Sequence, residues 1–139
     1  MTYATQSDLV DRFGEAELAQ RTNRVDGLTI DTAVLGRALA DADAEIDSYL
    51  TKRYALPLAS TPLVLTRLAC DITRYRLFDD GTPETVRLRY EDAVSLLRRF
   101  SSGDVQLAGV AAAAVAGVDT AHHAFAPRQM TDDSLRGFA

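Results

Sequence analysis

The stretch DADAEIDSYLTKRYALPL (Asp41–Leu58) decides the fold, because in it the longest helical pattern of the chain runs into a proline. Apolar residues recur at intervals of three and four, which predicts a helix from about Thr32 to Tyr54 with Asp31 as its N-cap. Pro57 has no N–H to donate and pushes Leu56 toward extended geometry, so the helix ends before it. The residues expected on its buried face are Leu35, Leu39, Ala42, Ile46, Tyr49 and Leu50.

Two short helices are expected before the long one. Thr5 and Asp8 form a capping-box pattern at the start of the first helix, and Gly14 is suited to end it. The second helix covers about residues 15–22, and the Asp-Gly pair at 26–27 marks the loop that follows.

Two medium-length helices are expected after the break. Each begins with a Thr-Pro pair, at 61–62 and 82–83, in which Thr is the cap and Pro the first helical residue. They run to about Phe78 and Phe100, and helices joined by short connections pack as roughly antiparallel neighbours. The expected fold is therefore all-α, a small helical bundle with one long central helix. Its further buried residues are Leu65, Leu68, Ala69, Ile72, Tyr75, Val86, Tyr90, Ala93, Val94, Leu97 and Phe100.

The composition changes after Gly103, which predicts a helical domain at 1–103 and a tail at 104–139. The tail begins with Gly, Ala and Val, whose small side chains bury little area against the roughly 1–2 kcal/mol that ordering each residue costs. We expect it to be extended or partly β. Larger apolar side chains then recur in a polar segment, a pattern typical of docking onto a partner. These anchors are Phe125, Met130, Leu135 and Phe138.

Length and charge restrict the class of protein. The 139 residues are enough for one domain, and a net charge of −5, from 15 basic and 20 acidic residues, disfavours a general nucleic-acid binder. The single cysteine, Cys70, lies in an apolar run and is expected to be a buried hydrophobe. The chain starts without a signal-peptide pattern and has no apolar run of about 18 residues, so we expect a soluble intracellular protein.

The four acids of the opening stretch raise the question of a metal or acid–base site. On a helix, Asp41 and Glu45 share one face while Asp43 and Asp47 share another, about 160° away, so the four cannot converge on one ion. We expect a solvated helix face with salt bridges. A contact with a basic patch of a partner and a metal site are the alternatives.

The basic end of the long helix is a second candidate. Basic side chains there interact favourably with the helix dipole, which accounts for Lys52 and Arg53 without a function. If this end does bind a partner, Arg53 is the candidate for an inter-subunit ion pair. Arg53 and Tyr54 are therefore the predicted interaction residues of the helical domain.

Patterns of known chemistry are absent from the sequence. The only histidines, His122 and His123, are adjacent and have no other ligand at a metal-binding spacing. The chain has neither a Gly-rich phosphate loop nor a GxSxG elbow. We predict no catalytic, cofactor or metal site, and no enzyme activity.

Arginines are frequent on the two later helices, where acids are interspersed among them. This mixture predicts a solvated surface or ion pairs between subunits, with nucleic-acid contact as the alternative. The arginines are Arg67, Arg74, Arg76, Arg87, Arg89, Arg98 and Arg99.

Several segments together resemble a phage family. They are DLVDRFGEAEL, ALADADAEIDSYLTKRYALPL, LACDITRYRL, RYEDAVSLLRRFSSGDVQL and the terminal SLRGF, and the second is the most specific. Over about residues 3–107 the chain is similar to the neck proteins of Mu-like phages and prophages. These are related in fold to the all-helical head–tail connector (adaptor) proteins of tailed phages.

The resemblance implies a structural role in the virion. Such connectors form a homo-oligomeric ring, commonly of twelve subunits, between the portal protein and a tail-side neck protein. DNA passes through without specific binding, and no catalytic residue is carried over. The expected location is the virion, and the host cytoplasm during assembly. The alternatives are a small helical DNA-binding regulator and, third, an enzyme subunit or other adaptor from a bacterial system.

Overall fold

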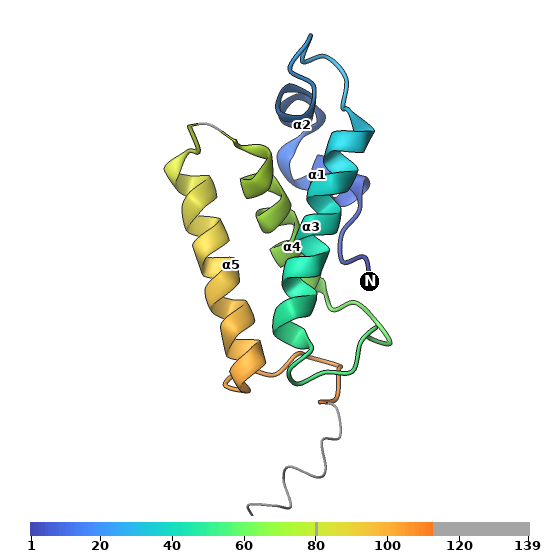
Figure 1. Cartoon of the computed structure of the whole chain (residues 1–139), viewed down its shortest axis with the longest axis vertical. Coiled ribbons are helices and arrows are strands. Elements are labelled where there is room, and N and C mark those ends of the chain that lie inside the picture. Colours follow the sequence, from blue (N-terminus) through green and yellow to red (C-terminus); the bar gives the residue numbers. More distant parts are fainter. Residues whose placement is uncertain (80, 113–139) are drawn as a thin grey trace, which may run out of the picture.

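The computed structural model describes residues 1–79 and 81–112, and this part of the chain is helical without strands. The all-α prediction is confirmed. The helices are α1 (Gln6–Phe13), α2 (Glu15–Thr22), α3 (Thr32–Leu50), α4 (Leu63–Leu77) and α5 (Glu84–Ser102). The last three pack against one another, while α1 and α2 lie across one end of this three-helix unit (Figure 1). No helix in the described ranges is both long and apolar enough to cross a membrane.

The starts of α1 and α3 confirm the capping predictions. The Thr5 hydroxyl accepts from the Asp8 N–H at 3.3 Å, and the Asp8 carboxylate accepts from the Thr5 N–H at 2.8 Å. Asp31 accepts from the N–H groups of Ala33 and Val34 at 3.0 and 3.3 Å. These bonds satisfy donors that a helix start otherwise leaves without partners.

The end of α3 differs from the prediction, which placed it at Tyr54. The helix ends at Leu50, whose carbonyl accepts from both Arg53 and Tyr54, at 3.0 and 2.8 Å. This tight turn directs Tyr54 inward, where it is only 3% exposed.

The prolines at the starts of α4 and α5 also lie one helix position earlier than expected. Pro62 and Pro83 have extended ψ angles of 145° and 148°, so each is the N-cap and not the first helical residue. Their carbonyls accept from Leu65 and Val86 at 3.0 and 3.1 Å. A proline φ near −60° is compatible with both positions, so the sequence rule could not separate them.

One hydrophobic core fills the space between the helices. Most predicted core positions are buried, including Ile46 and Leu97, and so is Cys70, whose thiol pKa is raised by burial to about 11. Five predicted core residues are only partly buried because they lie at the edges of their apolar stripes. These are Leu39, Tyr49, Tyr75, Tyr90 and Val94.

Chain packing continues beyond the expected domain boundary. After Gly103, which ends α5 with φ of 90°, the chain folds back and buries Leu107 to 3% exposure. The Leu107 N–H donates to the Tyr54 hydroxyl at 3.2 Å. Val105 and Val110 also pack on the core. The predicted anchors from Phe125 to Phe138 lie outside the described residues.

We expect Ile46→Ala and Leu97→Ala each to lower the free energy of unfolding by about 2–5 kcal/mol, because each leaves a cavity in a fully buried site. Leu88→Ala is the matched control, since Leu88 is on the same helix as Leu97 but 46% exposed. Urea unfolding followed by circular dichroism measures all three. Equal losses for Leu88→Ala and Leu97→Ala would contradict the assignment of the buried face.

Candidate functional site

Two acids of α3 hold the N-terminal segment in place. The backbone N–H of Tyr3 donates to Asp43 at 3.0 Å, and its hydroxyl donates to Asp47. The Tyr3 carbonyl accepts from the Thr66 hydroxyl on α4 at 2.9 Å. Burial, followed by the hydrogen bond to Asp47, raises the pKa of Tyr3. Tyr3 is thereby fixed between α3 and α4.

A third acid of the run, Glu45, joins α3 to α4 and α5. It accepts from Arg76 at 2.6 Å and from the Tyr90 hydroxyl at 3.0 Å. The ring of Tyr90 stacks on Tyr75, with centroids 4.0 Å apart and planes 9° from parallel. Burial, followed by the hydrogen bond to Glu45, raises the pKa of Tyr90 to about 12.

These contacts correct the expectation of a solvated acidic face. Three of the four acids are partly buried, and only Asp41 is exposed. The expected salt bridges are present at Glu45 but join helices of the same chain. Within the described ranges, no group of three or more His, Cys, Asp or Glu residues is placed to hold a metal ion.

Several arginines of the later helices are likewise paired inside the chain. Arg74 donates to both carboxylate oxygens of Glu17 on α2, at 2.8 and 2.9 Å, and stacks over Phe13 on α1. Arg87 pairs with Glu84 and Glu91 along α5. The sequence predicted a mixed solvated surface or ion pairs between subunits, whereas the ion pairs observed for these residues lie within one chain.

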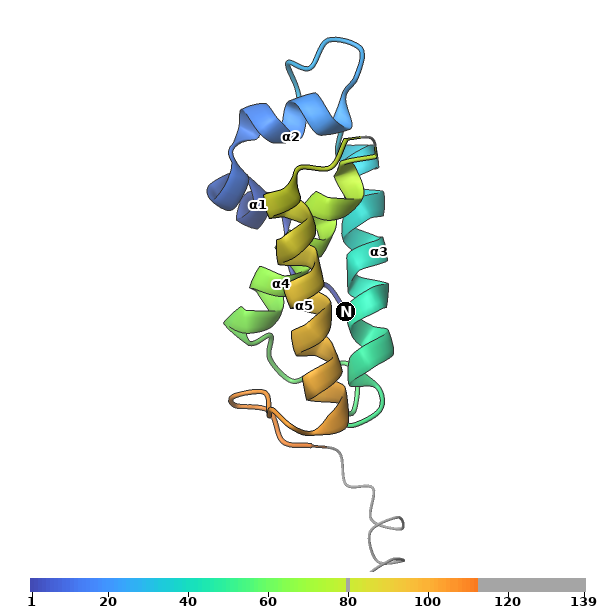
Figure 2. The same cartoon turned by 90° about the vertical axis from the view of Figure 1, so that its left-hand side faces the viewer.

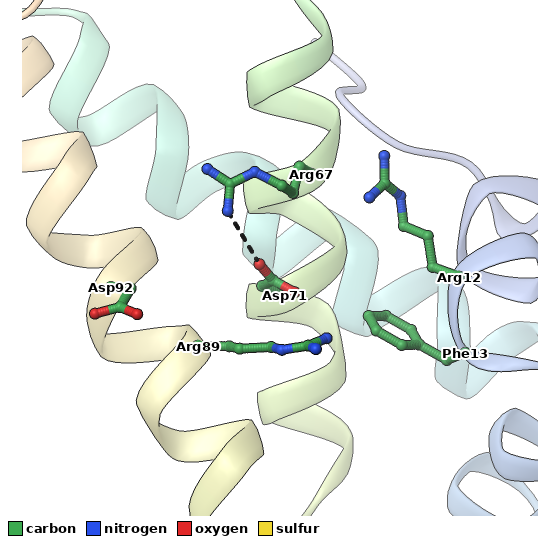
Figure 3. A pocket seen from close by; sticks show the side chains of 6 residues that line it. All are labelled: Arg12, Phe13, Arg67, Asp71, Arg89 and Asp92. Atoms are coloured by element: carbon green, nitrogen blue, oxygen red, sulfur yellow. Dashed lines mark ion pairs between the residues drawn. The ribbon is translucent and has the colours of Figure 1, made fainter.

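A cleft of about 430 Å³ lies where α1, α4 and α5 meet (Figure 3). Its lining is formed by Arg12, Phe13, Arg67, Asp71, Arg89 and Asp92. Asp71 is 7% exposed, and its one ion pair, with Arg67, is 3.9 Å long. Sequence reasoning noticed Arg67 and Arg89 separately but missed the cleft, because Arg12 comes from a helix more than fifty residues away along the chain.

The predicted interaction residues of the helical domain have different surroundings. Tyr54 is a core residue, so it fixes the end of α3 and presents almost no surface to a partner. Arg53 is partly exposed, and its guanidinium lies against Gly103, where an added Cβ would come within 2.6 Å of Nη1. The buried Nε of Arg53 has no hydrogen-bond partner among the described residues. A contact of Arg53 with a neighbour stays a prediction.

Fold and surface define a small all-helical domain whose helices are joined by internal ion pairs. Residues 3–124 match the family model described as Bacteriophage Mu, Gp36, and the chain belongs to this family. It is 37% identical over 105 residues to the Mu-like prophage FluMu protein gp36 of Haemophilus influenzae, covering 76% of this chain and 74% of the relative. It is also 37% identical over 105 residues to Gene product J of Escherichia phage Mu, covering 74% of each chain.

We expect Glu45→Gln to lower the pKa of Tyr90, because it removes the carboxylate that disfavours the tyrosinate. Since the folded pKa is raised above that of an unfolded tyrosine, Tyr90 stabilises the fold below about pH 10, and this stability is lost as the pH rises toward about 12. Ultraviolet titration of tyrosinate formation, assigned with Tyr90→Phe, measures the shift. Asp41→Asn, which removes an exposed acid of the same helix, should leave the Tyr90 titration nearly unchanged.

Proposed function

We propose that this protein is a structural component of the phage particle, a head–tail connector (neck) subunit that forms a ring between the portal and the tail. Membership of the Mu Gp36 family is the observation that carries the proposal. The all-helical fold around a central helix agrees with the resemblance to connector proteins. The subunit acts by binding its neighbours, not as an enzyme.

The proposal assigns partners and a location. The ring binds the portal protein on one side and a tail-side neck protein on the other, and DNA passes through it. A net charge of −5 supports passage without adhesion, because like charges repel the duplex. The protein assembles in the host cytoplasm and stays in the finished virion.

A small helical DNA-binding regulator is the second candidate. Such proteins usually present a basic recognition helix to DNA. Here Arg74, Arg76 and Arg87 are paired with acids of the same chain, which removes them from an uncompensated basic surface. This pairing favours the structural role.

Inactivating the gene with an early stop codon in an inducible prophage should yield DNA-filled heads and free tails but no joined particles. Electron microscopy of lysates counts the three species, and the intact gene supplied in trans should restore joining. If the mutant makes normal particles and the purified protein binds duplex DNA tightly with a steep salt dependence, the regulator replaces the connector as the conclusion.

Deleting residues 122–139 tests the docking tail. Because full burial of a large apolar side chain is worth roughly 1.5–3 kcal/mol, losing Phe125, Met130, Leu135 and Phe138 should prevent incorporation into particles competent for tail joining. The melting temperature of the helical domain should change little. A four-alanine variant at these positions is the matched control for chain length. Normal infectious yield from either variant would contradict the docking role.

A further inference from the structure

We propose that the cleft formed by Arg12, Arg67 and Arg89 binds a carboxylate side chain from a second copy of this chain. The inference rests on the proposed function, because it assigns one side of the subunit contact within the ring. It concerns the surface where α1, α4 and α5 meet (Figure 3).

The charges of the cleft are not balanced within the chain. Its lining carries three guanidinium groups and two carboxylates, which leaves one positive charge in excess. Arg67 alone forms an ion pair there; Arg12 and Arg89 form none with any residue that the structure describes. Elsewhere on α4, Arg74 and Arg76 contact their acids at 2.8 and 2.6 Å. The cleft therefore holds guanidinium groups available to an added anion.

Of the two carboxylates in the lining, Asp71 accepts no hydrogen bond from these guanidinium groups. Its contact with Arg67 is 3.9 Å long, too distant for a hydrogen bond, and its side chain is 9% exposed. Burial raises the pKa of Asp71, although Arg67, Arg89 and Arg12 act to lower it. Asp71 therefore balances part of the positive charge of the cleft but leaves Arg12 and Arg89 available.

The chemistry of the cleft favours a carboxylate over a phosphate. Asp71 and Asp92 line it and would repel the larger charge of a phosphate or a DNA backbone. One excess positive charge matches one carboxylate, and arginine binds a carboxylate through two parallel hydrogen bonds. Phe13 supplies an apolar wall against which the stem of an acidic side chain can pack.

A second copy of the chain carries suitable acids. The protein has 20 acidic and 15 basic residues, so acids remain after the internal pairs are formed. Asp41 on α3 is exposed, and although its charge acts on Arg76, it forms no ion pair or hydrogen bond with a residue that the structure describes. In Figure 2, α3 lies on one side of the domain and α1 lies on the other. Contact between two such different surfaces is the head-to-tail arrangement that a closed ring requires.

Zero-length carbodiimide cross-linking tests the proposal directly, because it joins a carboxylate to an amine in contact with it. The chain has one lysine, Lys52, so Lys52→Arg gives a background free of lysine amines. Adding Arg89→Lys places one amine in the cleft, and Arg98→Lys places one on the exposed surface of the same helix as the matched control. Mixing isotope-labelled and unlabelled full-length protein identifies cross-links between copies by mass spectrometry.

The Arg89→Lys protein should give mixed-isotope cross-links to an acid of another copy, at least about tenfold more than the Arg98→Lys protein. In sedimentation experiments, Arg12→Gln with Arg89→Gln should weaken self-association at least about tenfold, about 1.4 kcal/mol, whereas Arg98→Gln with Arg99→Gln should not. Cross-links confined to one chain, or a wild-type protein that stays monomeric at millimolar concentration, would overturn the proposal. The proposal would also be overturned if the Arg12→Gln, Arg89→Gln variant lost DNA binding but kept normal self-association.

Both measurements use purified protein, so they separate this inference from the proposed function. If the protein self-associates through the cleft but is not required for tail joining, only the connector role is refuted. If the protein is required for tail joining but its copies do not contact one another at the cleft, only the cleft contact is refuted.

Discussion

The apolar stripe of α3 and the acids on its two flanks constrain the rest of the domain. Ala42 and Ile46 face the core, and at about 100° per residue the pair Asp43 and Asp47 falls on one flank while Glu45 falls on the other. Each flank then receives a different partner. The N-terminal segment binds on the first flank and the later helices bind on the second. A rotation of α3 would break both sets of contacts together, so one helix fixes the relative positions of its neighbours.

This arrangement also explains why acids at these positions are compatible with a buried helix. An isolated carboxylate is costly to bury, but hydrogen bonds and opposite charges offset that cost. Asp43 receives a backbone N–H, and Glu45 receives a guanidinium and a hydroxyl. The acids therefore help to define how the helices pack as well as keeping their exposed edges hydrated.

The sequence predicted what depends on neighbouring residues and missed what depends on distant ones. Helical spacing and caps such as Thr5 and Asp31 act within a few residues, and the structure confirms both caps and most of the core. The partners of the α3 acids lie 31 to 45 residues away along the chain, so no local pattern revealed them. The predicted end of α3 was wrong for the same reason. Tyr54 is held by Leu107, which is 53 residues away.

The distribution of arginines connects the fold to the proposed assembly. Arginines that face an acid of another helix stabilise the domain, and Arg74 and Arg76 are held in this way. Arg12 and Arg89 line the cleft, and neither forms an ion pair with Asp71, which is 7% exposed. A buried acid whose one ion pair is 3.9 Å long contributes little to the stability of the folded chain, because its own burial opposes its charge. With Asp71 and Asp92 in its lining, the cleft has an excess of one positive charge, which a single carboxylate neutralises. An incoming carboxylate would complete the charge balance of the cleft, which suits the proposed contact between net-negative copies of this chain.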